Sequence, residues 1–428
     1  MRISRPAGQS VPSVAGCKLS IGGLEDIKMV GTRTSNLLKR FTNPLFICCL
    51  VTVGLCVHTA AALPGSGTQQ DPWRIQSLAD FDEFAADPNY WSGFTRLETD
   101  VNLAGRTYST AVIALDTNNS EDYFQGTAFT GVFDGNNHKI TGLTIEGGVN
   151  DYLGLFGFIS GGEIRKLRLE DVSVSGEYFV GGLVGRNSWG GSISNCYSTG
   201  SVSGTSEVGG LVGLNYGTIS NCYSTGSVSG DWLVGGLVGG NGGTVVSSYT
   251  TACVTGNSHV GGLVGLNGGY YRDWGCFKGM INDCYSTNVV TGVDYVGGLV
   301  GYNIGDVNQC YSAGEVTGAT NVSGLVVNCC CTGNDGLPIY WGAVNASFWD
   351  VQASSQTIGN GDTGKTTAEM QTKSTFTEAG WDFIEIWGIG ENQTYPYLRF
   401  APAGDFNYDK KVDLLDLAIL ASHWLEEN

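Results

Sequence analysis

Residues 209–230 have the sequence GGLVGLNYGTISNCYSTGSVSG, and this stretch recurs along the chain. Its first five residues begin again at the positions Gly181, Gly209, Gly235, Gly261 and Gly297, with a degenerate copy from Ser323. The steps between these starts are 28, 26, 26, 36 and 26 residues. One position, occupied by Cys196, Cys222, Ser248, Cys284 and Cys310, always lies 13 residues before the next start. All extra residues therefore enter between Gly-Gly-Leu-Val-Gly and this cysteine position.

Apolar residues alternate with Gly, Ser, Thr and Asn inside each copy, and this period of two is typical of strands with one buried face. A unit of a few short strands cannot bury its apolar face alone. Stacked units bury one continuous column and pair each backbone group with the coil above and below. The sequence therefore predicts an all-β fold, a parallel β-helix or β-solenoid.

Stacking in register places each residue on its counterpart in the next coil. We therefore expect ladders of like side chains, in which the asparagine amides hydrogen-bond to one another. The expected asparagine ladder contains Asn187, Asn215, Asn241, Asn267 and Asn303, and the expected tyrosine ladder contains Tyr197, Tyr223, Tyr249, Tyr285 and Tyr311.

The repeats divide the chain into five predicted parts. They are a signal peptide and presequence at 1–62, an N-terminal cap with the first strands at 63–150, the β-solenoid at 151–328, a C-terminal cap at 329–400 and a calcium-loop segment with a small helix at 401–428. Caps are expected because the open ends of a solenoid must be covered. A helix around 77–86 suits the first cap, and the tryptophan-rich stretch 348–397 suits the second.

The pattern Gly-Gly-Leu-Val-Gly-x-Asn, followed by Asn-Cys-Tyr-Ser-Thr-Gly, resembles the GLUG repeat of bacterial secreted and surface proteins. The resemblance covers about residues 150–330 closely. GLUG repeats are found in adhesin-like proteins and in some secreted immunoglobulin A peptidases, whose separate zinc domain carries His-Glu-x-x-His. This chain has only the histidines His58, His138, His259 and His423 and no such motif. A zinc peptidase is therefore not expected, because two histidines one helical turn apart are needed to hold the metal.

The composition excludes further classes of protein. The chain has 428 residues, of which 66 are Gly, 42% are hydrophobic and 14% are charged. This combination disfavours a disordered acidic chain, a coiled coil, and a collagen, whose Gly would recur at every third position. The formal net charge is −18. Nucleic acid is therefore not an expected partner, because its phosphates require a basic face.

The N-terminal segment has the features of a secretory signal. Lys39 and Arg40 precede an apolar run at 45–57, which is followed by three alanines at 60–62. A membrane anchor is the alternative, but this run is shorter than the roughly 20 residues that a spanning helix needs. We therefore expect cleavage after Ala62, a secreted or cell-surface location, and no transmembrane anchor in the mature chain.

A calcium loop is predicted near the C-terminus. Oxygen donors occur at the spacing of a 12-residue calcium loop, and an amphipathic helix follows. The predicted Ca²⁺ ligands are Asp405, Asn407, Asp409, Lys411 through its carbonyl, Asp413 and Asp416. The segment resembles one repeat of a type I dockerin, which implies attachment to a cohesin-like partner. It departs from that family because Lys410 stands where Gly is favoured and only one repeat is visible.

Two further features leave alternatives open. The repeated cysteine position forms a column along the stacked coils, which we call the cysteine column. It permits disulfides between neighbouring coils or a ladder of buried thiols, and we favour the ladder because Ser248 interrupts the column. The coil from Gly261 carries an insertion with residue types that stack on sugar rings, which predicts a ligand loop. Its candidate ligand-binding residues are Tyr270, Tyr271, Arg272, Asp273 and Trp274. A self-packed insertion is the alternative.

No catalytic residues are assigned from the sequence. Carboxylates are sparse between 172 and 328, and the two closest candidate pairs are Glu207 with Asp231 and Asp283 with Asp306. We therefore predict an exported, noncatalytic β-solenoid that acts in adhesion or surface structure or binds glycans. Its expected partners are a surface glycan or a cell-surface protein. The alternative is a secreted β-helix hydrolase or lyase that degrades polysaccharides and is recruited through the dockerin-like tail.

Overall fold

The computed structural model describes residues 62–119, 123–271, 275–332, 338–357, 359 and 363–399. The predicted signal segment up to Ala61 and the predicted calcium loop therefore lie outside the described residues. The described residues all belong to the compact unit that begins at Ala62.

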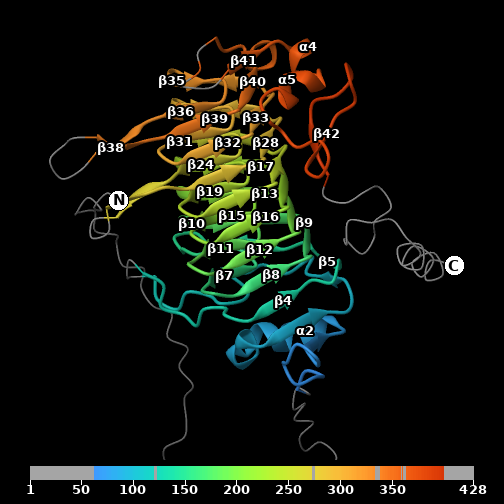
Figure 1. Cartoon of the computed structure of the whole chain (residues 1–428). Helices are drawn as coiled ribbons and strands as arrows, with labels where there is room; N and C mark the ends of the chain where they lie inside the picture. Colours follow the sequence, from blue (N-terminus) through green and yellow to red (C-terminus); the bar gives the residue numbers. More distant parts are fainter. Residues whose placement is uncertain are drawn as a thin grey trace, which may run out of the picture. The chain divides into compact units, whose positions relative to one another are not determined.

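Four parallel sheets run side by side along one axis and form the walls of a β-solenoid (Figure 1). The ten-stranded sheet contains β1 (Trp73–Ile75), β2 (Phe94–Leu97), β4 (Val132–Asp134), β8 (Glu163–Arg165), β12 (Ser192–Ser194), β16 (Thr218–Ser220), β20 (Thr244–Val246), β27 (Met280–Asn282), β32 (Asp306–Asn308) and β39 (Ala343–Asn345). The seven-stranded sheet contains β7 (Phe156–Ile159), β11 (Val184–Asn187), β15 (Val212–Asn215), β19 (Val238–Asn241), β24 (Val264–Asn267), β31 (Val300–Asn303) and β36 (Val326–Asn328). The six-stranded sheet contains β10 (Tyr178–Gly181), β14 (Ser206–Gly209), β18 (Trp232–Gly235), β23 (Ser258–Gly261), β30 (Asp294–Gly297) and β35 (Thr320–Ser323).

The fourteen-stranded sheet completes each coil. It contains β3 (Val101–Asn102), β5 (Lys139–Thr141), β6 (Thr144–Glu146), β9 (Arg168–Ser175), β13 (Tyr197–Ser203), β17 (Tyr223–Ser229), β21 (Tyr249–Thr250), β22 (Cys253–Thr255), β28 (Tyr285–Ser286), β29 (Val290–Thr291), β33 (Tyr311–Ser312), β34 (Val316–Thr317), β40 (Phe348–Asp350) and β41 (Thr363–Lys365). One coil passes in turn through the six-, seven-, ten- and fourteen-stranded sheets. This architecture confirms the predicted all-β parallel solenoid.

Successive coils pair in the register that the repeat predicts. In the seven-stranded sheet Val212 pairs with Val238, and Asn215 pairs with Asn241. The interior of one coil is made of residues that are at most 2% exposed, namely Val208, Leu211, Val212, Ile219, Cys222 and Val228. Burying each of the larger side chains contributes roughly 1.5–3 kcal/mol. The repeated apolar positions therefore build one continuous core.

The asparagine ladder is present and runs for six coils. The Nδ2 of Asn187 donates to Oδ1 of Asn215 at 2.8 Å, and this pattern continues along the ladder. The further donations run from Asn215 to Asn241, from Asn241 to Asn267, from Asn267 to Asn303 and from Asn303 to Asn328, at 2.8, 2.9, 2.8 and 2.8 Å. Each bond joins one coil to the next, so the buried amides satisfy one another.

The tyrosine ladder is also present, on the fourteen-stranded sheet. Ring centroids of successive members are 4.6, 4.9, 4.8 and 5.0 Å apart from Tyr197 to Tyr311. The rings are nearly parallel, with interplanar angles between 3° and 18°. The spacing follows that of neighbouring strands, about 4.8 Å.

The cysteine column consists of free thiols rather than disulfides. The backbone N–H of Cys196 donates to Sγ of Cys222 at 3.5 Å, and that of Cys222 donates to Oγ of Ser248 at 3.1 Å. Serine can therefore replace cysteine in the column, because its hydroxyl accepts the same bond. Burial raises the pKa of the Cys196 and Cys310 thiols.

The repeated coils have two corners at which a residue other than glycine adopts the left-handed backbone conformation. The residue before the cysteine position has φ between 46° and 53° in five coils, at Asn195, Asn221, Ser247, Asp283 and Gln309. The second corner has φ between 49° and 57° at Glu207, Leu233, His259 and Tyr295. Asn and Asp tolerate this conformation best, which explains the Asn before Cys in the repeat.

The two ends of the solenoid are covered by different structures (Figure 1). At the first end, α2 (Leu78–Ala86) begins at the predicted Ser77, and η1 (Pro88–Ser92) follows. The buried Phe84 of α2 packs against Phe133 of β4, with ring centroids 5.5 Å apart. At the other end lie α3 (Val351–Ser354), α4 (Thr367–Met370) and α5 (Lys373–Thr377), with the antiparallel pair β42 (Trp387–Gly388) and β43 (Tyr397–Leu398).

The ladder extends beyond residue 328, the last residue of the predicted solenoid. The strand β39 pairs with β32, and β40 pairs with β33, so one coil continues through 343–350. The boundary predicted between 328 and 329 falls inside this coil. An antiparallel hairpin of β37 (Cys330–Thr332) and β38 (Pro338–Trp341) interrupts it. The degenerate copy from Ser323 begins this coil, but the hairpin separates it from 343–350, so the spacing of the repeat does not show where the coil ends.

His259 lies at the second corner, in a stack of aromatic rings. Its ring centroid is 5.5 Å from that of Trp232, 5.0 Å from that of Tyr295 and 4.7 Å from that of Tyr302. Burial lowers the pKa of His259 to about 4, although the nearby Asp294 carboxylate acts in the opposite direction. The folded protein therefore holds this imidazole neutral over a range in which the unfolded chain binds a proton.

This pKa makes stability depend on pH. Between about pH 6.5 and pH 4 the unfolded chain binds a proton that the folded chain does not, so the free energy of unfolding should fall as the pH decreases. The loss amounts to roughly 3 kcal/mol by pH 4, at 1.36 kcal/mol per pKa unit. The variant His259→Leu should lack this part of the decline, because leucine binds no proton. Leucine should be tolerated at this corner, since Leu233 occupies the same position one coil earlier with φ of 53°. Urea unfolding of both proteins from pH 4 to pH 8 tests this, and parallel curves would contradict it.

Candidate functional site

The corner between the seven- and ten-stranded sheets differs from coil to coil. It follows the ladder asparagine and contains 188–191 in one coil, Tyr216 and Gly217 in the next, and Gly242 and Gly243 in the third. In the fourth coil it contains a hairpin of β25 (Gly269–Tyr271) and β26 (Gly275–Phe277). The side chains of this corner are not part of the repeated core. The corner can therefore differ in length and sequence between coils, and these differences determine the shape of the surface there.

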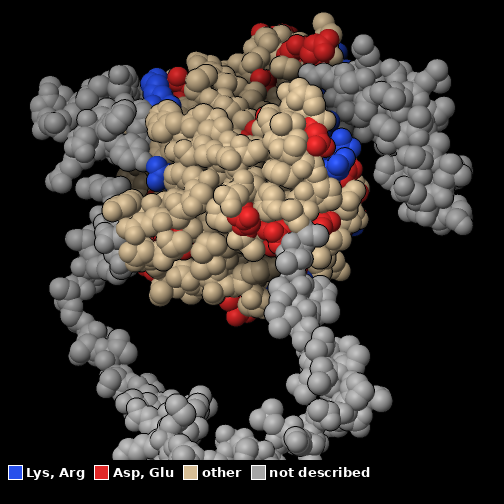
Figure 2. Space-filling model, turned by 90° about the horizontal axis from the view of Figure 1, so that it is seen from below, with Lys and Arg blue, Asp and Glu red and all other residues tan. Residues whose placement is uncertain are grey.

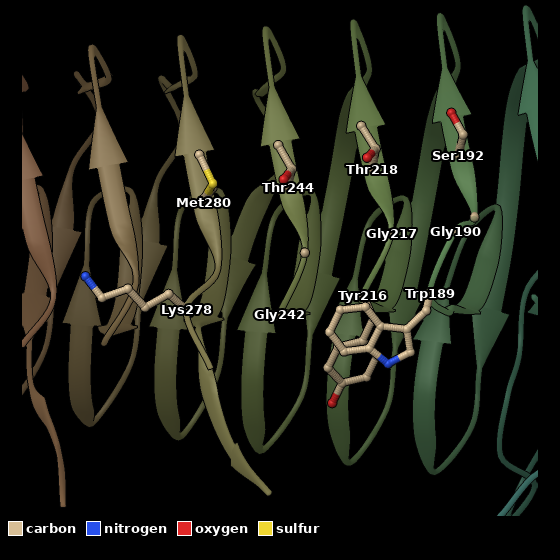
Figure 3. Close-up of a pocket in the computed structure, with 12 residues that line it drawn as sticks. Trp189, Gly190, Ser192, Tyr216, Gly217, Thr218, Gly242, Thr244, Lys278 and Met280 are labelled. Atoms are coloured by element: carbon tan, nitrogen blue, oxygen red, sulfur yellow. The ribbon is translucent and has the colours of Figure 1, made fainter. Parts of the chain in front are cut away.

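A hollow of about 350 Å³ lies along this corner. It crosses four strands, β12, β16, β20 and β27 (Figure 3). The side chains and backbone that line it belong to Trp189, Gly190, Gly191, Ser192, Tyr216, Gly217, Thr218, Gly242, Gly243, Thr244, Lys278 and Met280. We call this hollow the corner groove.

An aromatic pair forms one end of the corner groove (Figure 3). Trp189 is 63% exposed, and its ring stacks on Tyr216 with centroids 5.6 Å apart and an interplanar angle of 20°. The guanidinium carbon of Arg186 lies 5.3 Å from the ring centroids of both Tyr216 and Phe158. Such cation–π contacts hold the aromatic rings in place. Trp189 is thus an exposed ring on a packed support.

The floor of the corner groove is polar and uncharged. Ser192, Thr218 and Thr244 pair in register and lie in one row across successive strands (Figure 3). Within the described parts of the chain, none of their three hydroxyl groups makes a hydrogen bond to the protein. Each hydroxyl can therefore both donate to and accept from a ligand.

The far end of the corner groove carries the one charged side chain among its lining residues. The Nζ of Lys278 lies 2.8 Å from Oδ1 of Asp306, so the ammonium charge is balanced. Met280 beside it is 43% exposed. Figure 2 shows a different face, the molecule seen from below, where uncharged surface also dominates and acidic and basic side chains form small separate groups. The groove therefore suits a ligand that is polar but carries no charge.

The predicted ligand loop is only partly described. The backbone of Tyr270 and Tyr271 lies in the hairpin that projects from the solenoid, as an insertion should. Arg272, Asp273 and Trp274 lie outside the described residues, so their role stays a prediction. The six predicted calcium ligands, Asp405 to Asp416, lie outside them too. Lys278 directly follows β26, the second strand of the hairpin, and its side chain lines the corner groove.

The candidate carboxylate pairs do not pair across coils. Glu207 occupies the position of Leu233 in the next coil, whereas Asp231 lies opposite Thr205. Asp283 is buried and accepts a hydrogen bond at 3.1 Å from Nε1 of Trp387, and burial raises its pKa. Asp306 pairs with Lys278 instead. Asp283 is therefore a buried, hydrogen-bonded carboxylate.

Two absences apply to the described residues alone. No cluster of three or more His, Cys, Asp or Glu side chains there could hold a metal ion. No helix there has the length and the apolar character that crossing a membrane requires.

The corner groove was not predicted from the sequence. Trp189 and Tyr216 lie outside the alternating pattern of the strands, and a single aromatic residue next to glycine does not by itself indicate a binding site. One signal was available. The step from Gly181 to Gly209 is 28 residues rather than 26, and the two extra residues lengthen the corner that carries Trp189.

The GLUG motif matches three segments of the chain, at residues 176–203, 204–229 and 256–291. GLUG motif repeats are therefore present, as the resemblance implied. Halomucin of Haloquadratum walsbyi is 31% identical over 161 residues, which cover 36% of this chain and 2% of halomucin. A protein of Evansella cellulosilytica described as a Gly-rich membrane protein is 48% identical over 60 residues, 13% of this chain and 6% of that protein. This chain thus matches only a small part of the length of these curated relatives.

Two solved structures match this chain at low similarity. A Bacteroides ovatus protein described as an immunoglobulin A1 protease superimposes with a TM-score of 0.44 at 19% identity, over 78% of this chain and 94% of the other. A structure described as IgA1 Protease gives a TM-score of 0.41 at 18% identity, over 64% of this chain and 21% of the other. Similarity at this level carries no statement about activity.

Proposed function

We propose that this protein is an exported, noncatalytic β-solenoid that acts at the cell surface, in adhesion or as a structural element. The observation that carries the proposal is the nature of the repeated residues. Those that recur in each coil form the ladders and the core, whereas the charged side chains do not recur in each coil. The repetition therefore serves a rigid scaffold rather than a catalytic centre.

Two observations support export to the surface. The GLUG motif repeats resemble those of secreted and surface proteins, and one relative is described as a membrane protein. Leu63, the first residue after the predicted cleavage position, is 3% exposed and belongs to the core. Its backbone nitrogen donates to the hydroxyl of Tyr90 at 3.3 Å. A mature chain that begins at Leu63 would therefore keep its first side chain packed.

The test separates a scaffold from a polysaccharide-degrading enzyme. The full chain is expressed in a bacterium with a secretory pathway, recovered from the medium or the cell envelope, and sequenced from its N-terminus. We expect a start at Leu63, and no release of reducing ends or unsaturated products from a panel of polysaccharides. Cleavage of any of them would overturn the noncatalytic proposal, and retention of the protein in the cytoplasm would overturn export.

We further propose that residues 405–416 bind calcium and attach the solenoid to a cohesin-like partner. One Ca²⁺ per chain should bind, because six oxygen donors follow the spacing of a calcium loop. Titration calorimetry on the full chain measures this binding. The double variant Asp405→Ala with Asp409→Ala should abolish it, whereas Glu385→Gln, at an exposed acid outside the loop, should not. Equal heats from all three proteins would contradict the site.

A further inference from the structure

We infer that the corner groove binds a segment of a neutral oligosaccharide, stacked on Trp189. The inference rests on the proposed surface function and names the class of ligand. It concerns a site distinct from the predicted ligand loop, since it uses none of the residues 270–274.

The aromatic end of the groove has the form of a binding platform. An indole that is 63% exposed contributes little to folding, so its large apolar face is available to a ligand. The C–H faces of sugar rings are apolar and flat, and they pack on such a ring while the sugar hydroxyls stay in contact with water. Tyr216 stacks on one face of Trp189, and Arg186 contacts Tyr216 in turn, so the supported indole has less side-chain freedom to lose on binding.

The floor supplies hydrogen bonds at regular intervals. The hydroxyls of Ser192, Thr218 and Thr244 come from three adjacent strands, which are about 4.8 Å apart. From Ser192 to Met280 the row spans three strand intervals, roughly 14 Å. A shallow row of this length suits a chain of linked sugars that lies across the coils better than a single small molecule.

The electrostatics select a neutral ligand. The groove has one charged side chain among its lining residues, Lys278, and Asp306 balances its charge. The whole chain carries a net charge of −18, so a polyanion such as a uronate polymer or a nucleic acid would be repelled. Uncharged hydroxyls on a sugar match uncharged hydroxyls on the floor.

Affinity electrophoresis of the full chain provides the test, in gels that contain xyloglucan, arabinoxylan, glucomannan, galactomannan or mixed-linkage β-glucan. Gels with polygalacturonate serve as the anionic comparison. At least one neutral polysaccharide should retard the protein, and Trp189→Ala should weaken that binding by about tenfold or more, as expected for the loss of a central aromatic contact. The double variant Thr218→Val with Thr244→Val should weaken it several-fold.

Trp232→Ala is the matched control, because Trp232 is 41% exposed but lies on the six-stranded sheet, away from the groove. It should bind as the natural chain does, and unfolding in urea should show that all variants are folded. The inference is overturned if no neutral polysaccharide retards the protein, if only polygalacturonate does, or if Trp232→Ala loses as much affinity as Trp189→Ala. None of these results would affect the proposed export or the proposed lack of catalysis.

Discussion

Replacing Gly239 with alanine should destabilise the solenoid by about 3 kcal/mol, the upper end of the usual cost of overpacking. A Cβ at this position would lie 2.5 Å from the carbonyl carbon of Glu207 and 2.5 Å from the nitrogen of Val208. It would also lie 2.7 Å from the carbonyl oxygen of Gly213. All three are backbone atoms of the preceding coil, so no side-chain rotation can relieve the clash. The coils must separate locally, which breaks the ladder.

The next residue provides the control. A Cβ on Gly240 would approach Cδ1 of Leu214 at 2.9 Å, which is the flexible end of a side chain, and Cγ of Glu207 at 3.9 Å, an ordinary contact distance. Leu214 and Leu266 occupy the same position in the coils on either side. Gly240→Leu should therefore change the free energy of unfolding by less than about 1 kcal/mol, because the half-buried Leu214 and Leu266 show that this position accepts a leucine. Urea unfolding measures both variants, and equal stability of the two would show that the close approach at Gly239 does not govern coil packing.

Much of the solenoid follows from the repeat because the interior admits few alternatives. Residues that recur at the same place in each copy of the repeat must stack if coils are in register, so the asparagine and tyrosine ladders could be predicted with their members. The helix that begins after Ser77 could also be predicted, because the hydroxyl of Ser77 accepts a bond from the backbone of Asp80. These features depend on spacing and on local chemistry, both of which are visible in one sequence.

The features that escaped prediction depend on contacts between distant segments. Trp387 folds back to Asp283, and the hydroxyl of Tyr311 donates to the carbonyl oxygen of Pro396 at 2.6 Å. Such contacts have no periodic signature. The corner groove arises from the same cause, since Trp189 and Tyr216 belong to adjacent coils and meet only when these stack. The candidate site therefore lies at positions that vary between copies of the repeat. The sequence pattern predicts structure only at the positions that stay constant.

Replacing Asn241 with isoleucine should cost about 3 kcal/mol, because it interrupts the asparagine ladder in the middle. Asn215 would lose the acceptor that its Nδ2 now has at 2.8 Å, and Oδ1 of Asn267 would lose the donor that it has at 2.9 Å. Leaving a buried polar group without its partner costs about 1–3 kcal/mol for each group. The apolar gain of isoleucine offsets only part of this. Urea unfolding of the variant measures the loss.

The end of the same ladder separates this explanation from a general intolerance of the position. Oδ1 of Asn187 is buried and has no hydrogen-bond partner among the described residues, and Ile159 occupies the same position one coil earlier. Asn187→Ile removes the bond to Asn215, whose Oδ1 still accepts from the backbone of Gly217 at 3.2 Å, and a long bond of 3.4 Å from Nδ2 to the carbonyl oxygen of Gly191. Its cost should stay near 1 kcal/mol, because only the shorter of these bonds is a ladder bond and a typical net hydrogen bond contributes about that much. If both variants lost the same stability, the size of the side chain rather than the chain of amide bonds would determine the cost, and the ladder would not hold successive coils together.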